Sequence, residues 1–300
     1  MSFQYVLITP ARNEAALIER TIRSMVAQTR PPLRWVIVSD GSTDGTDEIV
    51  TRYEPEASWL ELMKLPPHEE RNFAAKVNAF NAGHDRVKGL AYDVIGNLDA
   101  DVSFPPDYFE CLLAKFETMP ELGVAGTHYV EGDFHSFGDS YINVHHVNGQ
   151  IQLFRRQCFD EVGGYRPIEG GGIDWVAVTT ARMKGWLTYS FGDRVFHHHR
   201  KMGTAGRSEL QSRFHYGKKD YFLGGHPVWQ IFRSTFQLAK RPYVVGGLAL
   251  MAGYLWCWIS GHERAVSDEL MRFHRAEQMA RLKSLLRLRG LERNGKEVRT

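Results

Sequence analysis

The stretch Asn97-Leu98-Asp99-Ala100-Asp101 places two carboxylates one residue apart at the end of an apolar run. Residues 92–98 are typical of a β-strand, and Pro105 and Pro106 prevent a helix from following. Two aspartates i and i+2 at a strand's end can both reach one cation, and Mg²⁺ and Mn²⁺ prefer carboxylate oxygens together with substrate phosphates. A bare Asp-x-Asp is also a common turn sequence. The neighbouring motifs must therefore decide between the two interpretations.

The composition is that of a folded globular chain with one large or two modest domains. A net charge of +2 is too small to indicate a nucleic-acid partner, although basic residues crowd toward the C-terminus. Three widely spaced cysteines form neither a disulfide framework nor a metal cluster in the sequence pattern. Because no signal peptide is recognisable at the N-terminus, we expect a protein that works on the cytoplasmic side.

A strand–helix–strand unit opens the chain. Residues 5–9 read as a buried strand, a polar loop follows at 12–14, and apolar residues at helical spacing extend to Val26. A second strand at 35–38 completes the unit, which predicts a parallel pair with a right-handed crossover. That strand runs into a loop of Ser, Thr, Asp and Gly at residues 39–46. Ligands bind at the carboxyl edge of open α/β sheets, so this loop is a candidate binding site.

Three motifs follow one another at plausible intervals: Thr-Pro-Ala-Arg-Asn-Glu at 9–14, Val-Ser-Asp-Gly-Ser-Thr-Asp-Gly-Thr at 38–46, and Leu-Asp-Ala-Asp at 98–101. Together they resemble family 2 glycosyltransferases of the GT-A fold. The resemblance implies an α/β fold whose central, mostly parallel sheet is flanked by helices, and an inverting transfer that depends on Mn²⁺ or Mg²⁺. Neither Gly-x-Gly-x-x-Gly after the first strand nor a Walker loop is present, which disfavours NAD-binding and ATP-hydrolysing proteins.

The same resemblance assigns the first loops to the nucleoside of a nucleotide sugar. Asp40 would accept a hydrogen bond from the base, and Glu14 would lie near the base or ribose. Asp99 would lie nearer the ribose, while Asp101 would hold the metal. The residues expected to bind the nucleotide sugar are Pro10, Arg12, Glu14, Asp40, Ser42, Arg71, Lys76, Asp99 and Arg200. Asp40 and Ser42 could instead make only an Asx-type turn and a helix N-cap.

Basic residues in two further segments could contact the phosphates. Residues 71–83 are expected to form a helix capped by Gly83, which would bring Arg71 or Lys76 to the nucleotide. Both could equally be solvated helix charges. Residues 200–207, which include Arg200, Lys201 and Arg207, look like a mobile loop that could close on the pyrophosphate.

Asp174 is the candidate catalytic base. An inverting transfer needs a group that takes the proton of the acceptor hydroxyl. Family 2 enzymes commonly supply it from a Glu-Asp pair that opens a helix and is followed by an Arg and a Gly. Here Ile173 replaces the first acid, and Arg182 and Gly185 follow. Asp174 matches the second acid, but Asp also favours a helix N-cap without any catalytic function.

Three consecutive histidines, His197, His198 and His199, end the last expected strand of the catalytic domain. With a period of two, the first and third face one side of the strand and the second faces the other. Some GT-A enzymes add a histidine from this region to the Asp pair. We therefore expect His197 and His199 to be metal ligands beside Asp101, although the pattern does not say which histidine makes the contact.

The sequence predicts a catalytic domain at 1–222, with a nucleotide-binding half at 1–105 and an acceptor half at 106–222, and a helical extension at 223–300. The extension contains an uncharged run at 243–260 and then a basic amphipathic helix. We expect a peripheral or re-entrant contact with the membrane rather than a spanning helix. Packing of the amphipathic helix on the catalytic domain or on a dimer partner is the alternative.

These features together predict an enzyme on the cytoplasmic face of the membrane. It would move a sugar from a nucleotide-sugar donor to a lipid-linked or polysaccharide acceptor for a surface glycan, and UDP is the nucleotide that we expect in the donor. Two other functions are compatible with a similar sheet. One is a nucleotidyltransferase, although the Gly-rich basic loop typical of that class is absent after the first strand. The other is a non-catalytic membrane scaffold of the same fold.

Overall fold

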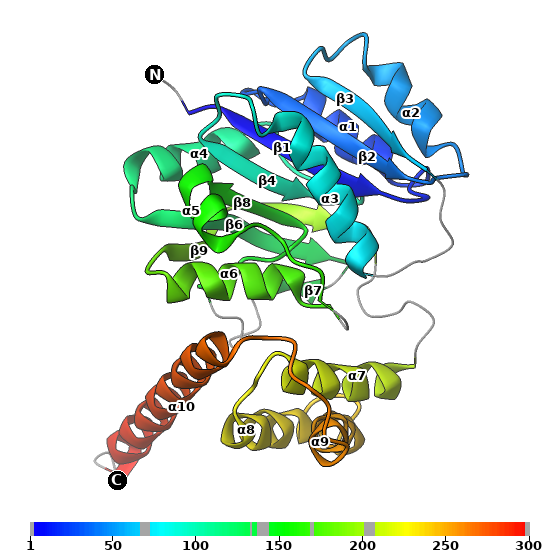
Figure 1. The fold of residues 1–300 in the computed structure, drawn as a ribbon. Helices are drawn as coiled ribbons and strands as arrows, with labels where there is room; N and C mark the ends of the chain where they lie inside the picture. The colour runs from blue at the N-terminus through cyan, green and yellow to red at the C-terminus, as the bar shows by residue number, and fades with distance from the viewer. Residues whose placement is uncertain are drawn as a thin grey trace. The chain divides into compact units, whose positions relative to one another are not determined.

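The computed structural model describes residues 3–66, 73–132, 134–136, 144–168, 171–200 and 208–297. Two compact units make up the chain. The first comprises residues 1–169 and 173–201, and the second comprises residues 170–172 and 202–300. The first unit is a sheet with helices on both faces, and the second is helical (Figure 1).

The sheet of the first unit has the strand order β3-β2-β1-β4-β8-β6-β9-β5, with β7 paired to β6. Its strands are β1 (Tyr5–Ala11), β2 (Arg34–Asp40), β3 (Leu60–Leu65), β4 (Val94–Leu98), β5 (Val102–Ser103), β6 (Leu122–Glu131), β7 (Phe134–His135), β8 (Ile151–Arg155) and β9 (Leu187–His198). The predicted β1–β2 pair is parallel, as are β1–β4 and β2–β3. Beyond β4 the sheet is mixed, because β8 runs antiparallel to both β4 and β6.

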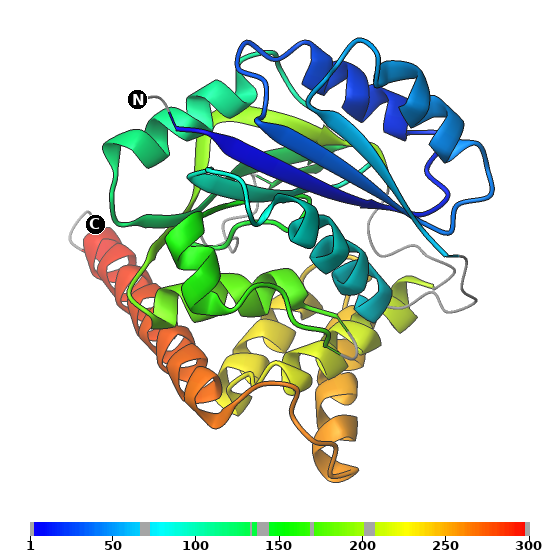
Figure 2. The same ribbon diagram turned by 45° about the horizontal axis from the view of Figure 1, so that its top comes forward.

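Six helices cover the two faces of this sheet: α1 (Ile18–Val26), α2 (Thr46–Tyr53), α3 (Phe73–Val87), α4 (Tyr108–Thr118), α5 (Arg156–Val162) and α6 (Ile173–Met183). Alternate residues of β1 enter different cores. Tyr5 and Leu7 pack with α1 and α4, whereas Val6 and Ile8 pack with α3, α5 and α6. Figure 2 shows the two helical layers on opposite sides of the strands. A continuous apolar run is what a strand buried on both faces requires.

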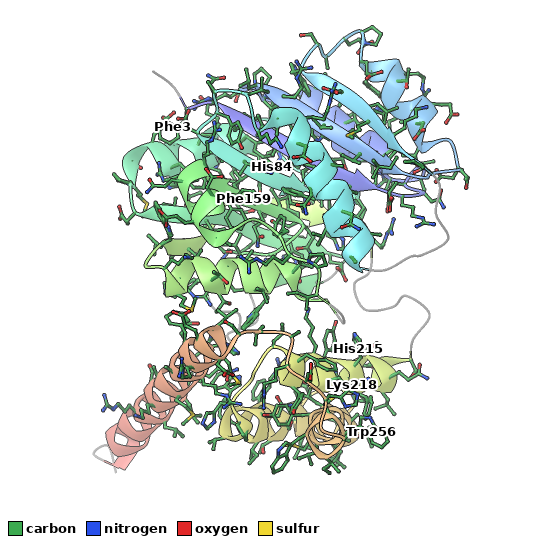
Figure 3. All side chains as sticks on the ribbon, viewed as in Figure 1. Phe3, His84, Phe159, His215, Lys218 and Trp256 are labelled. Carbon is green, nitrogen blue, oxygen red and sulfur yellow. The ribbon has the colours of Figure 1, made fainter. Side chains whose placement is uncertain are left out.

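The contact of α3 with the sheet corrects one expectation. Gly83 does not end the helix, which continues to Val87. A β-carbon at Gly83 would lie 2.7 Å from Cγ2 of Ile8 and 2.9 Å from Cγ2 of Val38, so glycine here permits close helix–sheet packing. Further along α3, the His84 ring lies 5.3 Å from the ring of Phe159 on α5, and Figure 3 shows both side chains.

The second unit consists of α7 (Glu209–Phe222), α8 (Pro227–Leu238), α9 (Val245–Ile259) and α10 (Asp268–Glu297). Helices α7 and α9 approach closely, since a β-carbon at Gly217 would lie 2.0 Å from the Leu250 carbonyl oxygen. This packing places α7 in the second unit, whereas the sequence predicted a helical extension that begins at residue 223. No helix within the described ranges is both long and apolar enough to cross a bilayer.

Candidate active site

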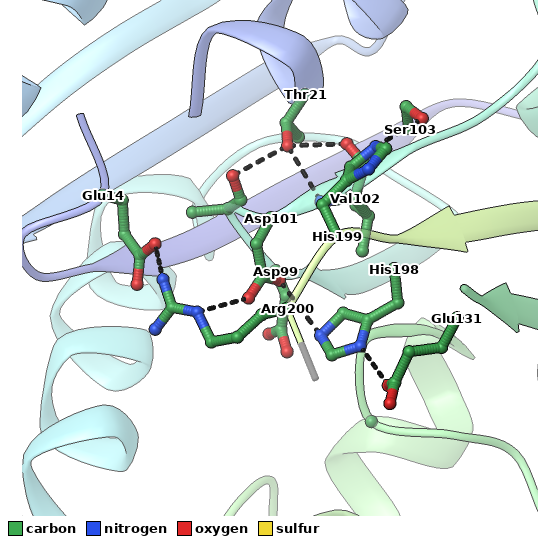
Figure 4. A network of polar contacts seen from close by, with 12 residues as sticks. Glu14, Thr21, Asp99, Asp101, Val102, Ser103, Glu131, His198, His199 and Arg200 are labelled. Carbon is green, nitrogen blue, oxygen red and sulfur yellow. Dashed lines mark hydrogen bonds and ion pairs between the residues drawn. The ribbon is translucent and has the colours of Figure 1, made fainter. Parts of the chain in front are cut away.

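Thr21 of α1 fixes the turn that carries the two aspartates. Its hydroxyl oxygen lies 2.9 Å from the carbonyl oxygen of Ala100 and 2.8 Å from that of Val102, and it accepts a hydrogen bond from the Val102 N–H at 3.2 Å (Figure 4). Thr21 is fully buried. One side chain therefore holds the backbone on both sides of Asp101, which orients that carboxylate without any turn glycine.

We expect Thr21→Val to lower the free energy of unfolding by about 1–3 kcal/mol, because the buried backbone groups around Asp101 lose their partner while the side-chain volume is retained. Urea denaturation measures the change. Thr118→Val is the matched control, since the Thr118 hydroxyl bonds only carbonyls of its own helix at an exposed position. An equal effect of both substitutions would contradict the special role of Thr21.

A cavity of about 240 Å³ lies where β1, β2 and β4 end. Its walls come from the three motifs of the sequence, together with α3 and the end of β9. The lining residues are Pro10, Ala11, Arg12, Glu14, Asp40, Ala75, Lys76, Asp99, Ala100, Asp101 and Arg200. The structure thus gathers most of the residues predicted to bind the nucleotide sugar into one hollow. Arg71, Lys201 and Arg207 lie outside the described residues.

Ser42 does not line this cavity. Its hydroxyl accepts a hydrogen bond from the Asn13 N–H at 3.1 Å, and Asn13 Oδ1 accepts one from the Thr43 N–H at 2.9 Å. The Glu14 N–H donates to the Thr46 hydroxyl at 2.8 Å. The two nucleoside loops of the prediction are therefore tied to each other, and Asn13 takes up a positive φ of 55° within them.

Lys76 and Asn97 hold Asp99. The Lys76 ammonium lies 2.7 Å from Asp99 Oδ1, and the Asn97 amide nitrogen lies 3.0 Å from the same oxygen. Burial raises the pKa of Asp99; Lys76 opposes this rise and the nearby Asp101 adds to it. Burial disfavours the charge of Lys76, yet Asp99, Asp174 and Asp101 together keep its pKa above the usual value. The Lys76 ammonium is therefore paired with Asp99 in the wall of the cavity, while its side chain stays 40% exposed.

Asp101 has a different environment. Its Oδ2 lies 3.3 Å from Nε of Arg200, and Arg200 also pairs with Glu14. Its Oδ1 is buried and has no hydrogen-bond partner. Burial disfavours the charge of Asp101, but His198, Arg200 and Lys76 hold its pKa below the usual range. Asp101 is consequently an ionised carboxylate with one oxygen available to a cation.

Of the three histidines, His198 is the one whose side chain faces the Asp101 carboxylate, while the His199 backbone N–H donates to the Asp101 carbonyl oxygen at 2.9 Å. Nε2 of His198 is 3.5 Å from Asp101 Oδ1, and its Nδ1 is 2.8 Å from a carboxylate oxygen of Glu131 on β6 (Figure 4). His197 is exposed. Nε2 of His199 lies 2.8 Å from the Ser103 hydroxyl. His197 and His198 do face opposite sides of β9, as a period of two predicts, but the side that faces Asp101 is the side of His198, which pairs with Val102. The choice of His197 and His199 as metal ligands was therefore wrong about the side of the strand.

Asp174 lies in the first turn of α6, one residue inside the helix, and so is not its N-cap. A β-carbon at Gly149 would lie 2.8 Å from the Asp174 β-carbon and 3.0 Å from its Oδ2. Asp174 is half-buried and close enough to affect the pKa values of Lys76 and Tyr165. It does not line the cavity, but it belongs to the same charged group as Asp99.

Sequence analysis missed Thr21, Asn97 and Glu131. Thr21 and Asn97 sit among apolar residues of a helix and a strand, where only a polar residue in an otherwise buried pattern could have marked them. Glu131 acts through pairing with a residue 67 positions away. No group of three or more His, Cys, Asp or Glu side chains in the described part of the chain is arranged to hold a metal ion.

Comparisons with known proteins agree with this geometry. The family model described as glycosyl transferase family 2 matches residues 6–167, more than half of the chain. Glucosyl-dolichyl phosphate glucuronosyltransferase of Haloferax volcanii is 26% identical over 260 residues, which cover 79% of this chain and 75% of that protein. The matched share differs among curated relatives, from 32% of one protein's length to 80% of another's.

Two solved structures share the fold. The mannosyltransferase PcManGT from Pyrobaculum calidifontis, in complex with GDP-Man and Mn²⁺, superposes with a TM-score of 0.55 at 20% identity and covers 95% of this chain and 81% of that one. TarS residues 1–349 from S. aureus, in complex with UDP-GlcNAc, superposes with a TM-score of 0.53 at 13% identity and covers 84% of this chain and 71% of that one. The fold of the first unit is therefore that of GT-A glycosyltransferases.

Proposed function

The chain belongs to glycosyl transferase family 2, and we propose that it is an inverting enzyme. Its nucleotide-sugar donor binds in the cavity at the ends of β1, β2 and β4, and we expect the nucleotide to be UDP. The observation that carries this proposal is the convergence of Asp40, Lys76, Asp99 and Asp101 on one hollow. Asp40 would accept a hydrogen bond from the base. Arg12, Lys76 and Arg200 offer positive charge to the phosphates.

The residues around Asp101 fit a divalent cation. The buried Oδ1 of Asp101, which makes no hydrogen bond, lies 3.5 Å from Nε2 of His198, and Glu131 holds the other ring nitrogen of His198, as carboxylates commonly do for metal-binding histidines. Two protein ligands suffice where substrate phosphates and water fill the other positions. We therefore propose Mn²⁺ or Mg²⁺ between Asp101 and His198. When bound, such an ion offsets the charge that develops on the leaving diphosphate.

We expect His198→Ala to weaken Mn²⁺ binding by about 100-fold or more, because a proposed ligand is lost and even the loss of a group that supports a ligand costs about 10- to 100-fold. Calorimetric titration of the chain with Mn²⁺ in the presence of UDP measures this directly. His197→Ala is the matched control, because His197 is exposed and should leave the affinity unchanged. Equal effects of the two substitutions would contradict the choice of His198 as the metal ligand among the three histidines.

Asp174 is the proposed general base. Its place in the first turn of a helix, in the charged group of Asp99 and Lys76 but outside the donor cavity, supports this function. Burial disfavours the charge of Lys76, and the carboxylates Asp99, Asp174 and Asp101 together raise the pKa of Lys76 above its usual value. The base would take the hydroxyl proton as the oxygen attacks the anomeric carbon.

A thermal-shift screen tests donor binding. UDP-, GDP- and dTDP-sugars with Mn²⁺ or Mg²⁺ should each be compared with the metal alone, because a ligand stabilises only the state that it binds. We expect one nucleotide class to raise the melting temperature, and Asp40→Ala to remove that increase. No shift with any nucleotide would contradict the proposal.

We further propose that the acceptor is lipid-linked and that the second unit contacts the cytoplasmic face of a membrane. The dolichyl phosphate in the name of the Haloferax relative supports the lipid-linked acceptor. The chain has no Asp, Glu, Lys or Arg between Arg241 and Glu263. Within this segment Trp256 and Trp258 are 58% and 63% exposed, and Figure 3 marks Trp256 on α9. Exposed tryptophans beside an uncharged helix are typical of membrane interfaces.

Trp256→Ser with Trp258→Ser should weaken vesicle binding about 10-fold or more, since burial of one large apolar side chain contributes about 1.5–3 kcal/mol. Flotation with phosphatidylglycerol-containing vesicles measures this. The control is Val26→Ser with Leu33→Ser, two apolar residues of the first unit with 42% and 38% exposure. Failure of the unsubstituted chain to float with any vesicle would contradict membrane contact.

A further inference from the structure

One amide side chain and one peptide connect Asp99 to Asp174. The side-chain nitrogen of Asn97 donates to Asp99 Oδ1 at 3.0 Å and to the carbonyl oxygen of Gly149 at 2.6 Å. The Asp99 N–H in turn donates to the Gln150 carbonyl oxygen at 2.8 Å. Asn97 is 3% exposed, so its amide is shielded from water. The segment before β8 is therefore fastened at two points to the end of β4.

The α-carbon of Gly149 lies against the side chain of Asp174. A β-carbon at position 149 would lie 2.8 Å from the Asp174 β-carbon, 3.0 Å from Oδ2 and 3.1 Å from the carboxyl carbon. A side chain at position 149 would therefore force Asp174 to move, because its β-carbon would overlap the β-carbon of Asp174. The same glycine thus receives the hydrogen bond from Asn97 at its carbonyl and leaves room for Asp174 at its α-carbon.

We propose that Asn97 and Gly149 are positioning residues, which set the Asp174 carboxylate relative to Asp99 and hence relative to the donor. This inference rests on the proposed functions of Asp99 and Asp174. A base must lie within hydrogen-bond reach of the proton that it removes. Misplacement by about 1 Å can cost about 10²-fold in rate. Gly149 does not line the donor cavity and contacts Asp174, so a substitution at Gly149 should act on the reaction step and not on nucleotide binding. Asn97 also holds Asp99 of that cavity, so its loss should affect donor binding as well.

The test is Gly149→Ala, with two measurements on the full chain. Calorimetry gives the Kd for UDP with Mn²⁺. Hydrolysis of the sugar nucleotide selected by the thermal-shift screen gives kcat, because water then takes the acceptor's place and must also lose a proton. We expect kcat to fall about 10²-fold while the Kd for UDP stays within about threefold, as for an interaction that serves only the transition state.

Gly89→Ala is the matched control. A β-carbon at Gly89 would meet nothing within 4 Å, so this variant should keep both the kcat and the Kd of the unsubstituted chain. Asn97→Leu provides a second variant of similar shape, in which the amide donor is lost. If both residues act through one link, the double variant should lose much less activity than the product of the two single losses.

Three outcomes overturn the inference. They are an unchanged kcat for Gly149→Ala, a fall in kcat matched by an equal loss of UDP affinity, and full additivity of Asn97→Leu with Gly149→Ala. Asp174→Asn separates this failure from that of the proposed function. If Asp174→Asn is inactive while Gly149→Ala is fully active, only the link is wrong. If Asp174→Asn is fully active, Asp174 is not the base.

Discussion

Asp101→Ala should abolish sugar transfer, with turnover reduced by about 10³-fold or more, because the variant loses the ionised carboxylate proposed to hold the metal against the diphosphate. Three features support so large an effect: the backbone on both sides of Asp101 is held by Thr21, its pKa is held below the usual range, and its buried Oδ1 lies 3.5 Å from Nε2 of His198. Release of nucleoside diphosphate from the donor measures the loss.

Metal removal should reproduce this result. EDTA is expected to stop turnover, and added Mn²⁺ or Mg²⁺ should restore it. The matched control is Asp107→Ala. Asp107 precedes α4, its carboxylate pairs with Arg194, and it does not line the cavity. Asp107→Ala should therefore keep its activity. Full activity in EDTA would show that the reaction needs no metal, and would leave Asp101 with a purely electrostatic function toward Arg200.

Asp174→Asn should lower kcat by about 10²- to 10⁴-fold, the contribution expected of a positioned general base, and should leave donor affinity nearly unchanged. The amide keeps the shape of the side chain against Gly149 but cannot accept the proton at neutral pH. Asp174 does not line the donor cavity, which is why binding and turnover should separate. Single-turnover kinetics with saturating donor measures the step directly.

Asp160→Asn is the control for this substitution, since Asp160 is an exposed carboxylate on α5 outside the cavity. It should not change kcat. A parallel loss of donor affinity in Asp174→Asn would indicate that Asp174 binds the donor through Lys76, and unchanged kcat would remove it from the reaction altogether.

The first half of the fold was largely predictable because its signals are local. Residues 5–9 and 35–38 form a continuous apolar run each, and the structure pairs them in parallel as β1 and β2. The strand at Leu60–Leu65 was missed, since its alternate residues are only partly buried at the edge of the sheet. The antiparallel direction of β8 also went unpredicted, because pairing with β4 and β6 depends on contacts far apart in the sequence.

The candidate site could be predicted where motifs carry it, and not where tertiary contacts do. Asp40 ends β2, and Asp99 and Asp101 follow β4. Because the ends of these parallel strands meet at one edge of the sheet, the sequence was enough to predict that the three carboxylates lie near one another. The histidine that faces Asp101 depended on which side of β9 points inward, and the pairing of His198 with Val102 sets that side. Asn97 matters through an acceptor 52 residues away, which no local pattern reveals.

The central claim is that this cavity holds a nucleotide sugar for transfer of the sugar. The most direct measurement uses the purified chain and the donor selected in the thermal-shift screen. Ion-exchange chromatography identifies the product that is released, and Asp101→Ala is measured in parallel. We predict release of the nucleoside diphosphate, and none from Asp101→Ala. Release of sugar 1-phosphate with the nucleoside monophosphate passed to water, through cleavage of the diphosphate, would make the protein a nucleotidyltransferase. Donor binding without any released product would make it a non-catalytic member of the fold. Either result would contradict the account.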